Sequence, residues 1–171
     1  SRHTTLRTVT GVQPGALPIC RAAEPGAFVR AMRVAVGSQR RLYVPAGVYR
    51  VSRLSLPSGL SLRGAGRAST WLKGRLDFGS NQVIRNLKIG DYGNSAVHNK
   101  PGARNTVFED CRFRGGGGKA WTYVVWLGYD GSCSNITFRR CDVECNLGTE
   151  NSSMSNGFND VTIWCDTDSA V

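Results

Sequence analysis

The 171-residue sequence lacks the features that mark several common protein classes. It has no apolar run approaching the roughly 18 residues that a membrane-spanning helix needs, so we expect no membrane span. It has only two histidines, His3 and His98, and no Cys-x-x-Cys spacing, which argues against a zinc site. No signal peptide is visible at the start, so the location must be inferred by other means.

Acidic residues are scarce in the first 100 residues. This part holds 16 Lys and Arg against 3 Asp and Glu, whereas residues 101–171 hold 6 against 9. Such asymmetry can steer a polyanion toward one end of a molecule, although solvated surface arginines would give the same count. Nucleic acid is not an expected partner, because the basic residues form no dense run and are not interleaved with aromatic residues.

Glycine is abundant, at 21 residues, and short apolar stretches alternate between glycines and prolines. This pattern predicts many short β-strands joined by tight turns. Residues 1–23 show little periodicity and are predicted to form an extended leader. The domain proper is predicted over residues 24–171, opening with a short helix between Pro25 and Val36 that Gly37 ends.

A repeat organises the second half of the sequence. Copies begin at Asn81, Asn105 and Asn135, so the second interval is longer than the first, and a weaker fourth copy begins near Asn159 with a shift in register. A repeat of this length with strand periodicity predicts stacked coils that share one core. The longer interval contains a run of glycines, residues 115–118, and predicts an insertion there.

The segments 42–51 and 60–70 resemble the opening coils of the pectate-lyase-like superfamily. The resemblance spans about residues 25–171 and implies an all-β, right-handed parallel β-helix with a short N-terminal capping helix. It also implies an extracellular location, or one at a virion or cell surface. We expect the last coil to continue into further coils or to be covered by its own tail or a partner, self-association included, because an open coil would expose unpaired backbone groups.

The superfamily contains uronate lyases, hydrolases, epimerases, phage tailspikes and adhesins, so the resemblance does not fix an activity. Its catalytic patterns Gly-His-Gly, Arg-Ile-Lys and Asp-Pro-His-Glu are absent from this sequence, and no catalytic residue is carried over from them.

Aligning the copies predicts which side chains face inward. One inward column contains Leu87, Cys111, Cys141 and Cys165. Neighbouring strands lie about 4.8 Å apart, so the cysteines would form a buried ladder. We interpret them as small apolar packing residues, because free cysteine is among the most buried residue types.

The outward columns predict a site. One column reads Lys88, Arg112, Asp142 and Asp166, and the other reads Gly90, Arg114, Glu144 and Asp168. Stacked carboxylates can share a proton or bind a cation, so Asp142, Glu144, Asp166 and Asp168 are candidate catalytic residues. Asp142 and Asp166 are also candidate calcium ligands. The alternative is that the columns form solvated cross-strand ion pairs, which contribute little individually.

Three cations and two aromatic residues complete the predicted site. Lys88, Arg112 and Arg114 would hold a uronate carboxylate, with arginine able to make a bidentate contact. Trp121 and Trp126 could stack on sugar rings, although residues 123–127 alternate as a strand and part of this aromatic run would then be packing.

These patterns predict a polysaccharide-interacting protein, as a lyase or hydrolase acting on an acidic, uronate-containing glycan. The resemblance implies that a lyase would use calcium to acidify the uronate proton, and a hydrolase would use paired carboxylates. The alternative is a non-catalytic structural or adhesion module, such as a tailspike-type or cell-surface coil stack.

Overall fold

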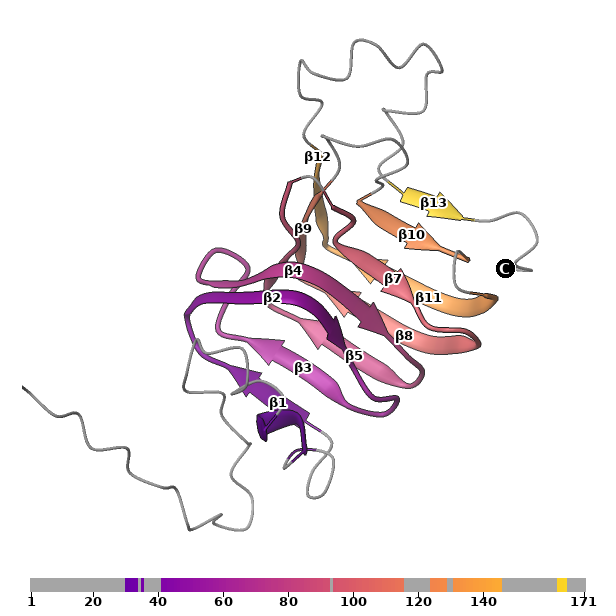
Figure 1. Ribbon diagram of the computed structural model, residues 1–171, viewed down its shortest axis with the longest axis horizontal. Helices are drawn as coiled ribbons and strands as arrows, with labels where there is room; N and C mark the ends of the chain where they lie inside the picture. The colour runs from indigo at the N-terminus through magenta and orange to yellow at the C-terminus, as the bar shows by residue number, and fades with distance from the viewer. Residues whose placement is uncertain are drawn as a thin grey trace, which may run out of the picture.

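The computed structural model describes residues 30–33, 35, 41–92, 94–115, 124–128, 131–145 and 163–165. Their strands form two sheets that curl around one core (Figure 1), and every printed pairing is parallel. No helix among these residues is long and apolar enough to cross a membrane.

The five-stranded sheet contains, in spatial order, β1 (Arg41–Val44), β3 (Ser61–Gly64), β5 (Gln82–Arg85), β8 (Ala103–Glu109) and β11 (Cys133–Arg139). The eight-stranded sheet follows the order β12 (Asp142–Cys145), β9 (Arg112–Gly115), β6 (Lys88–Ile89), β4 (Thr70–Phe78), β7 (Val97–Asn99), β10 (Val125–Leu127) and β13 (Ile163–Cys165), and β2 (Gly47–Ser55) pairs with β4.

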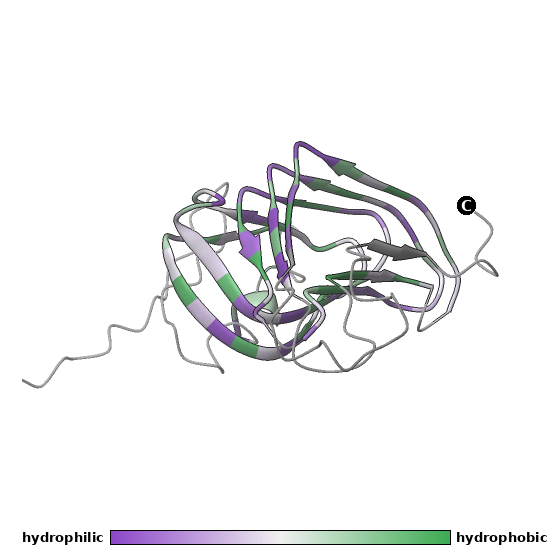
Figure 2. Ribbon diagram, turned by 90° about the horizontal axis from the view of Figure 1, so that it is seen from above, coloured by the Kyte–Doolittle hydropathy of each residue, from purple (hydrophilic) through white to green (hydrophobic). Residues whose placement is uncertain are grey.

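The core lies between the two sheets and follows from period-two alternation. In the five-stranded sheet the inward column Leu42, Leu62, Ile84 and Phe108 is paired strand to strand and fully buried. Polar and apolar residues therefore alternate along the strands (Figure 2), as expected when side chains point to opposite faces.

The predicted repeat is confirmed by the strand registers. Gln82 pairs with Thr106, and Thr106 pairs with Ile136, which reproduces both intervals between the aligned copies. The Asn at which each copy begins adopts a left-handed conformation, with φ between 51° and 57° at Asn81, Asn105 and Asn135. Their side-chain amides form a ladder, with Nδ2–Oδ1 distances of 3.2 and 2.8 Å.

The additional residues of the longer interval enter after β9. The paired residues Lys88 and Arg112 are separated by the same number of residues in the sequence as Asn81 and Asn105, the starts of the first two copies. The sequence separation is larger between the paired residues Val97 and Val125. Between Thr106 and Ile136 it equals the separation of Asn105 and Asn135, the starts of the second and third copies. The insertion predicted from the glycines therefore lies between β9 and β11, mostly before β10, and residues 116–123 themselves lie outside the described part.

Strand β4 divides the eight-stranded sheet into two branches. Its residues Trp71 and Leu72 pair with β6, whereas Leu76–Phe78 pair with β7. Gly74 lies between the two segments at φ 146°, where an added Cβ would overlap the Val51 carbonyl oxygen. The register of β2 shifts opposite this point, between Arg50 and Arg53.

The prediction of a right-handed parallel β-helix is wrong for the described residues. They form two parallel sheets with a half-barrel curl, and the eight-stranded sheet branches at β4 instead of repeating a uniform coil. The cause is that β4 is one continuous nine-residue strand that pairs on one edge with the equally long β2, whereas β6 and β7 on its other edge are separate short strands. Of the predicted capping helix, residues 30–33 and 35 are helical, and Met32 and Ala35 are buried in the core.

The alignment of the fourth copy is also wrong. It placed Cys165 beside Cys141, but β13 pairs with β10, in the register Leu127↔Cys165. The inward position of the other two cysteines is supported, since Cys111 is fully buried and Cys141 partly buried, both as free thiols packed at the core. The predicted leader, residues 1–23, lies outside the described residues.

We predict that Gly74→Ala destabilises the protein strongly. The substitution strains a left-handed backbone, at about 1–3 kcal/mol, and also drives Cβ into the Val51 carbonyl. Gly102→Ala is the matched control, because Gly102 has φ 69° but no heavy atom within 4 Å of its added Cβ. Urea unfolding should show a larger loss of unfolding free energy for Gly74→Ala, and equal losses would contradict the clash.

Candidate functional site

The outward side chains of β6, β9 and β12 form a network of ion pairs. The registers place Lys88 beside Arg112, Arg112 beside Asp142, and Arg114 beside Glu144. The two outward columns predicted from the repeat are therefore brought together in these three strands. Their geometry is that of cross-strand ion pairs, and the catalytic and binding roles of these residues stay predictions.

Glu144 is the most strongly held carboxylate of the network. The Arg114 guanidinium contacts both of its oxygens, with Nε–Oε2 at 3.0 Å and NH2–Oε1 at 2.6 Å, and Lys88 Nζ lies 3.6 Å from Oε2. The Arg114 hydrogen bonds lower the pKa of Glu144 from its ordinary 4.5 to about 2. The side chain is thus a charged acceptor near neutral pH, whereas a general acid needs a pKa near the working pH.

Asp142 lies between two guanidinium groups. Arg112 NH2 is 3.3 Å and Arg67 NH1 3.2 Å from its Oδ2, and these side chains are 43–45% exposed. Arg67 lies just before β4, so this contact links the start of the central strand β4 to the edge strand β12. Pairs this exposed stabilise the fold by about 1 kcal/mol or less.

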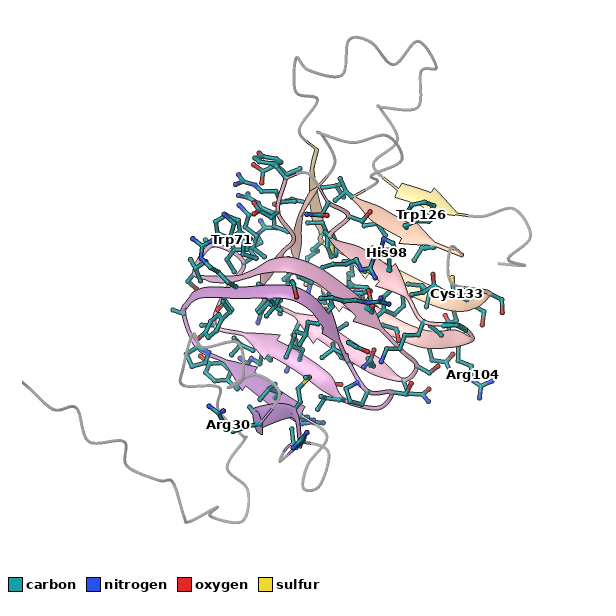
Figure 3. The ribbon with its side chains drawn as sticks, viewed as in Figure 1. Arg30, Trp71, His98, Arg104, Trp126 and Cys133 are labelled. Atoms are coloured by element: carbon teal, nitrogen blue, oxygen red, sulfur yellow. The ribbon has the colours of Figure 1, made fainter. Side chains whose placement is uncertain are left out.

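Trp71 in β4 adds an aromatic ring to the network. Its Nε1 donates to the Gly90 carbonyl at 2.7 Å, which fixes the indole orientation. The cations of Lys88, Lys73 and Arg114 lie 4.5, 5.2 and 5.4 Å from the ring centroid, within cation–π range. Figure 3 shows Trp71 and Trp126 on opposite sides of the molecule.

Tyr92 closes the other side of Arg114. The Arg114 Cζ lies 4.5 Å from the tyrosine ring centroid, and the Tyr92 hydroxyl donates to Glu144 Oε1 at 3.4 Å. We call the set Trp71, Lys73, Lys88, Tyr92 and Arg114 the Trp71 face.

The Trp71 face and its ion-pair partners carry excess positive charge. Three carboxylates contact five cations, with Asp91 paired to Lys73 at 3.2 Å. Burial and the nearby Arg114 lower the pKa of Lys88. A further anion bound here would therefore meet incompletely neutralised cations.

Trp126, which the sequence predicted to bind sugar, is not part of this face. Trp126 lies in β10, where it pairs with His98, and their ring centroids are 5.5 Å apart. Trp121, Asp166 and Asp168 lie outside the described residues. The roles predicted for these four residues stay predictions.

The predicted calcium site has little support in the described residues. They contain no group of three or more His, Cys, Asp or Glu side chains that could hold a metal ion. Asp142 is surrounded by arginines, which disfavour a divalent cation. Because its proposed partner Asp166 is not described, calcium binding stays a prediction.

The sequence alignment missed Trp71, Lys73 and Tyr92. Trp71 pairs with Lys88 across a shorter separation than either interval of the repeat, so no aligned column contains it. Tyr92 lies in the connection after β6, outside every aligned column. A search for strand-like segments separated by fewer residues than the repeat would have paired residues 71–72 with residues 88–89.

Comparison with protein-family models, with curated proteins and with solved structures gives no match. The resemblance to the pectate-lyase-like superfamily therefore stays a prediction, and the function must be argued from the site itself.

We predict that Glu144→Gln lowers stability at neutral pH, by about 1 kcal/mol for a partly exposed pair. A carboxyl with a lowered pKa stabilises the fold above its unfolded pKa and loses that contribution as the pH falls toward 2. The difference in unfolding free energy between the wild type and Glu144→Gln should thus shrink as pH falls from about 5 to about 2. A difference that stays constant with pH, measured by urea unfolding, would contradict this. An Arg114→Gln background should reduce the pH dependence to the smaller part that Lys88 contributes.

Proposed function

We propose that this protein binds an acidic polysaccharide on the Trp71 face without cleaving it. The observation that carries the proposal is the Trp71 ring, fixed by its hydrogen bond to Gly90 and surrounded by three cations within 5.4 Å of its centroid. Aromatic rings offer an apolar surface to sugars, while lysine and arginine bind carboxylates.

The arginines would recognise the acidic groups of the glycan. Arg114 already binds the Glu144 carboxylate with two nitrogens, which is the bidentate geometry that a uronate would require. A uronate approaching Trp71 would meet Lys73 and Lys88 and could share Arg114 with Glu144. Location outside the cell, or at a virion or cell surface, where such glycans occur, is part of the same proposal.

Binding is favoured over hydrolysis by the state of the carboxylates. A glycosidase needs one carboxylic acid with a raised pKa to protonate the leaving group, whereas arginine lowers the pKa of Glu144 to about 2. Asp142 forms ion pairs with two arginines, so both carboxylates of the network already bind cations.

We predict that Trp71→Ala and Arg114→Gln each weaken binding of oligogalacturonate at least tenfold. The first removes the stacking ring and the second a charge-assisted contact, which contributes about 1.5–3 kcal/mol. Trp126→Phe is the control, because Trp126 lies in β10 and away from the Trp71 face. Isothermal titration calorimetry would measure the dissociation constants, with circular dichroism checking that each variant folds.

The methyl-esterified oligomer is the matched ligand control, since it keeps the sugar rings and loses the charge. We expect it to bind at least tenfold more weakly than the acid form. Equal affinity for both forms, or loss of binding only in Trp126→Phe, would overturn the assignment to the Trp71 face. Release of unsaturated uronate ends or new reducing ends would contradict binding without cleavage.

A further inference from the structure

A second basic site lies on the other sheet. The outer face of β1, β3 and β5 is hollowed into a groove of about 210 Å³, lined by Arg41, Ser61, Arg63, Val83 and Arg85 together with Leu42 and Leu62. No residue of the Trp71 face lines it. The groove is independent of the function proposed above.

The three arginines reach the groove from successive strands. Arg63 and Arg85 are direct partners in adjacent strands, and Arg41 pairs with Ser61, which shares the outward face of β3 with Arg63. Adjacent strands are about 4.8 Å apart, so three long side chains border one small space. Arg41 and Arg63 are exposed and Arg85 is partly exposed.

These arginines have no carboxylate partner among the described residues. The contrast within the same sheet is direct, because Glu109 stands opposite Arg85 in register but binds Arg140 at 2.7 Å and Arg139 at 3.7 Å. On the eight-stranded sheet, Arg112 and Arg114 each face a carboxylate.

Leaving Arg63 and Arg85 directly opposite each other works against folding. Like charges in a cross-strand pair are destabilising, and the neighbouring Glu109 forms its ion pairs with Arg139 and Arg140 instead. A bound anion would neutralise the repulsion, which gives the groove charge complementarity toward an anionic ligand.

We propose that this groove binds a tetrahedral oxyanion, the sulfate or phosphate ester group of a larger ligand. Each guanidinium presents five N–H donors in a planar fork, and a carboxylate is satisfied by one such fork in a bidentate pair. The three terminal oxygens of a sulfate or phosphate ester match three arginines. The groove is smaller than the roughly 300–1,000 Å³ of sites that enclose a drug-sized ligand, so it takes the anionic group alone.

Val83 suggests where the rest of the ligand would lie. It is a 40% exposed apolar residue that lines the groove from β5, two residues before Arg85. The carbon skeleton next to the ester would contact this side chain, while the charged group lies among the guanidiniums.

The test is an NMR titration of the arginine Nε–H signals with inorganic sulfate, inorganic phosphate and acetate, at constant ionic strength. We expect saturable shifts with sulfate or phosphate, and at least tenfold weaker binding of acetate. Thermal stability alone would be a poor measurement, because sulfate stabilises most proteins by exclusion from their surface. Non-saturable shifts, or equal binding of acetate, would overturn the proposal.

Variants locate the site. Arg63→Gln and Arg41→Gln should each weaken binding of the preferred ion at least tenfold, and Arg41 at the start of β1 provides a second variant if Arg63→Gln does not fold. Arg104→Gln is the matched control, since Arg104 is exposed on β8 and does not line the groove. Unchanged binding in both groove variants, or equal weakening in the control, would overturn the assignment.

Binding of galactose 6-sulfate is then compared with binding of galactose 6-phosphate. The two sugars differ only in the anionic group, so the comparison shows which ester the groove prefers. Tighter binding of either one than of the free ion supports the proposal and identifies the ester. A single-stranded oligonucleotide that binds more tightly than both sugars, with affinity rising with its length, would overturn it in favour of a nucleic-acid surface.

Discussion

Left-handed corners near both ends of β5, β8 and β11 keep these strands in register. The first corner contains Asn81, just before β5, and Asn105 and Asn135, near the starts of β8 and β11. The second contains Asn86, Asp110 and Arg140, which follow these strands, and all six residues have φ between 50° and 59°. The first corner is joined by amide–amide hydrogen bonds, and in the second Arg140 binds Asp110 at 2.8 Å. Because a slip of one residue would move every side chain to the opposite face, both the buried cysteines and the outward ion pairs depend on these corners.

The repeat made much of this arrangement predictable. The spacing of its copies correctly placed Cys111 next to the core and brought Lys88, Arg112 and Asp142 into one outward row. The branch at Gly74 could not be predicted, because it depends on how a glycine at φ 146° and a register shift in β2 bend one long strand. For the same reason Trp71 was not predicted as a site residue. The fourth copy was aligned by matching Cys165 to Cys141, whereas the structure pairs β13 with β10.

Charge is distributed differently on the two outer faces. On the eight-stranded sheet, cross-strand carboxylates neutralise most of the cations, and the remaining excess is gathered around an oriented indole ring. On the five-stranded sheet the acidic residues appear only from β8 onward, so the first three strands keep their positive charge. The basic residues of the first half of the sequence are therefore divided between the two faces: Arg67, Lys73 and Lys88 have carboxylate partners on the eight-stranded sheet, whereas Arg41, Arg63 and Arg85 line a groove without them on the five-stranded sheet.

The branched sheet also bears on how such a chain tolerates change in length. Beyond β4 each turn crosses this sheet as two short strands, so residues added between them lengthen a loop and leave both registers intact. The widening of the strand-to-strand spacing after β9 is an instance of this, because β11 still stacks in register on β8. Evolution, or a protein engineer grafting a recognition loop, can therefore vary the connection between β9 and β10 while the stacked strands on either side stay in place.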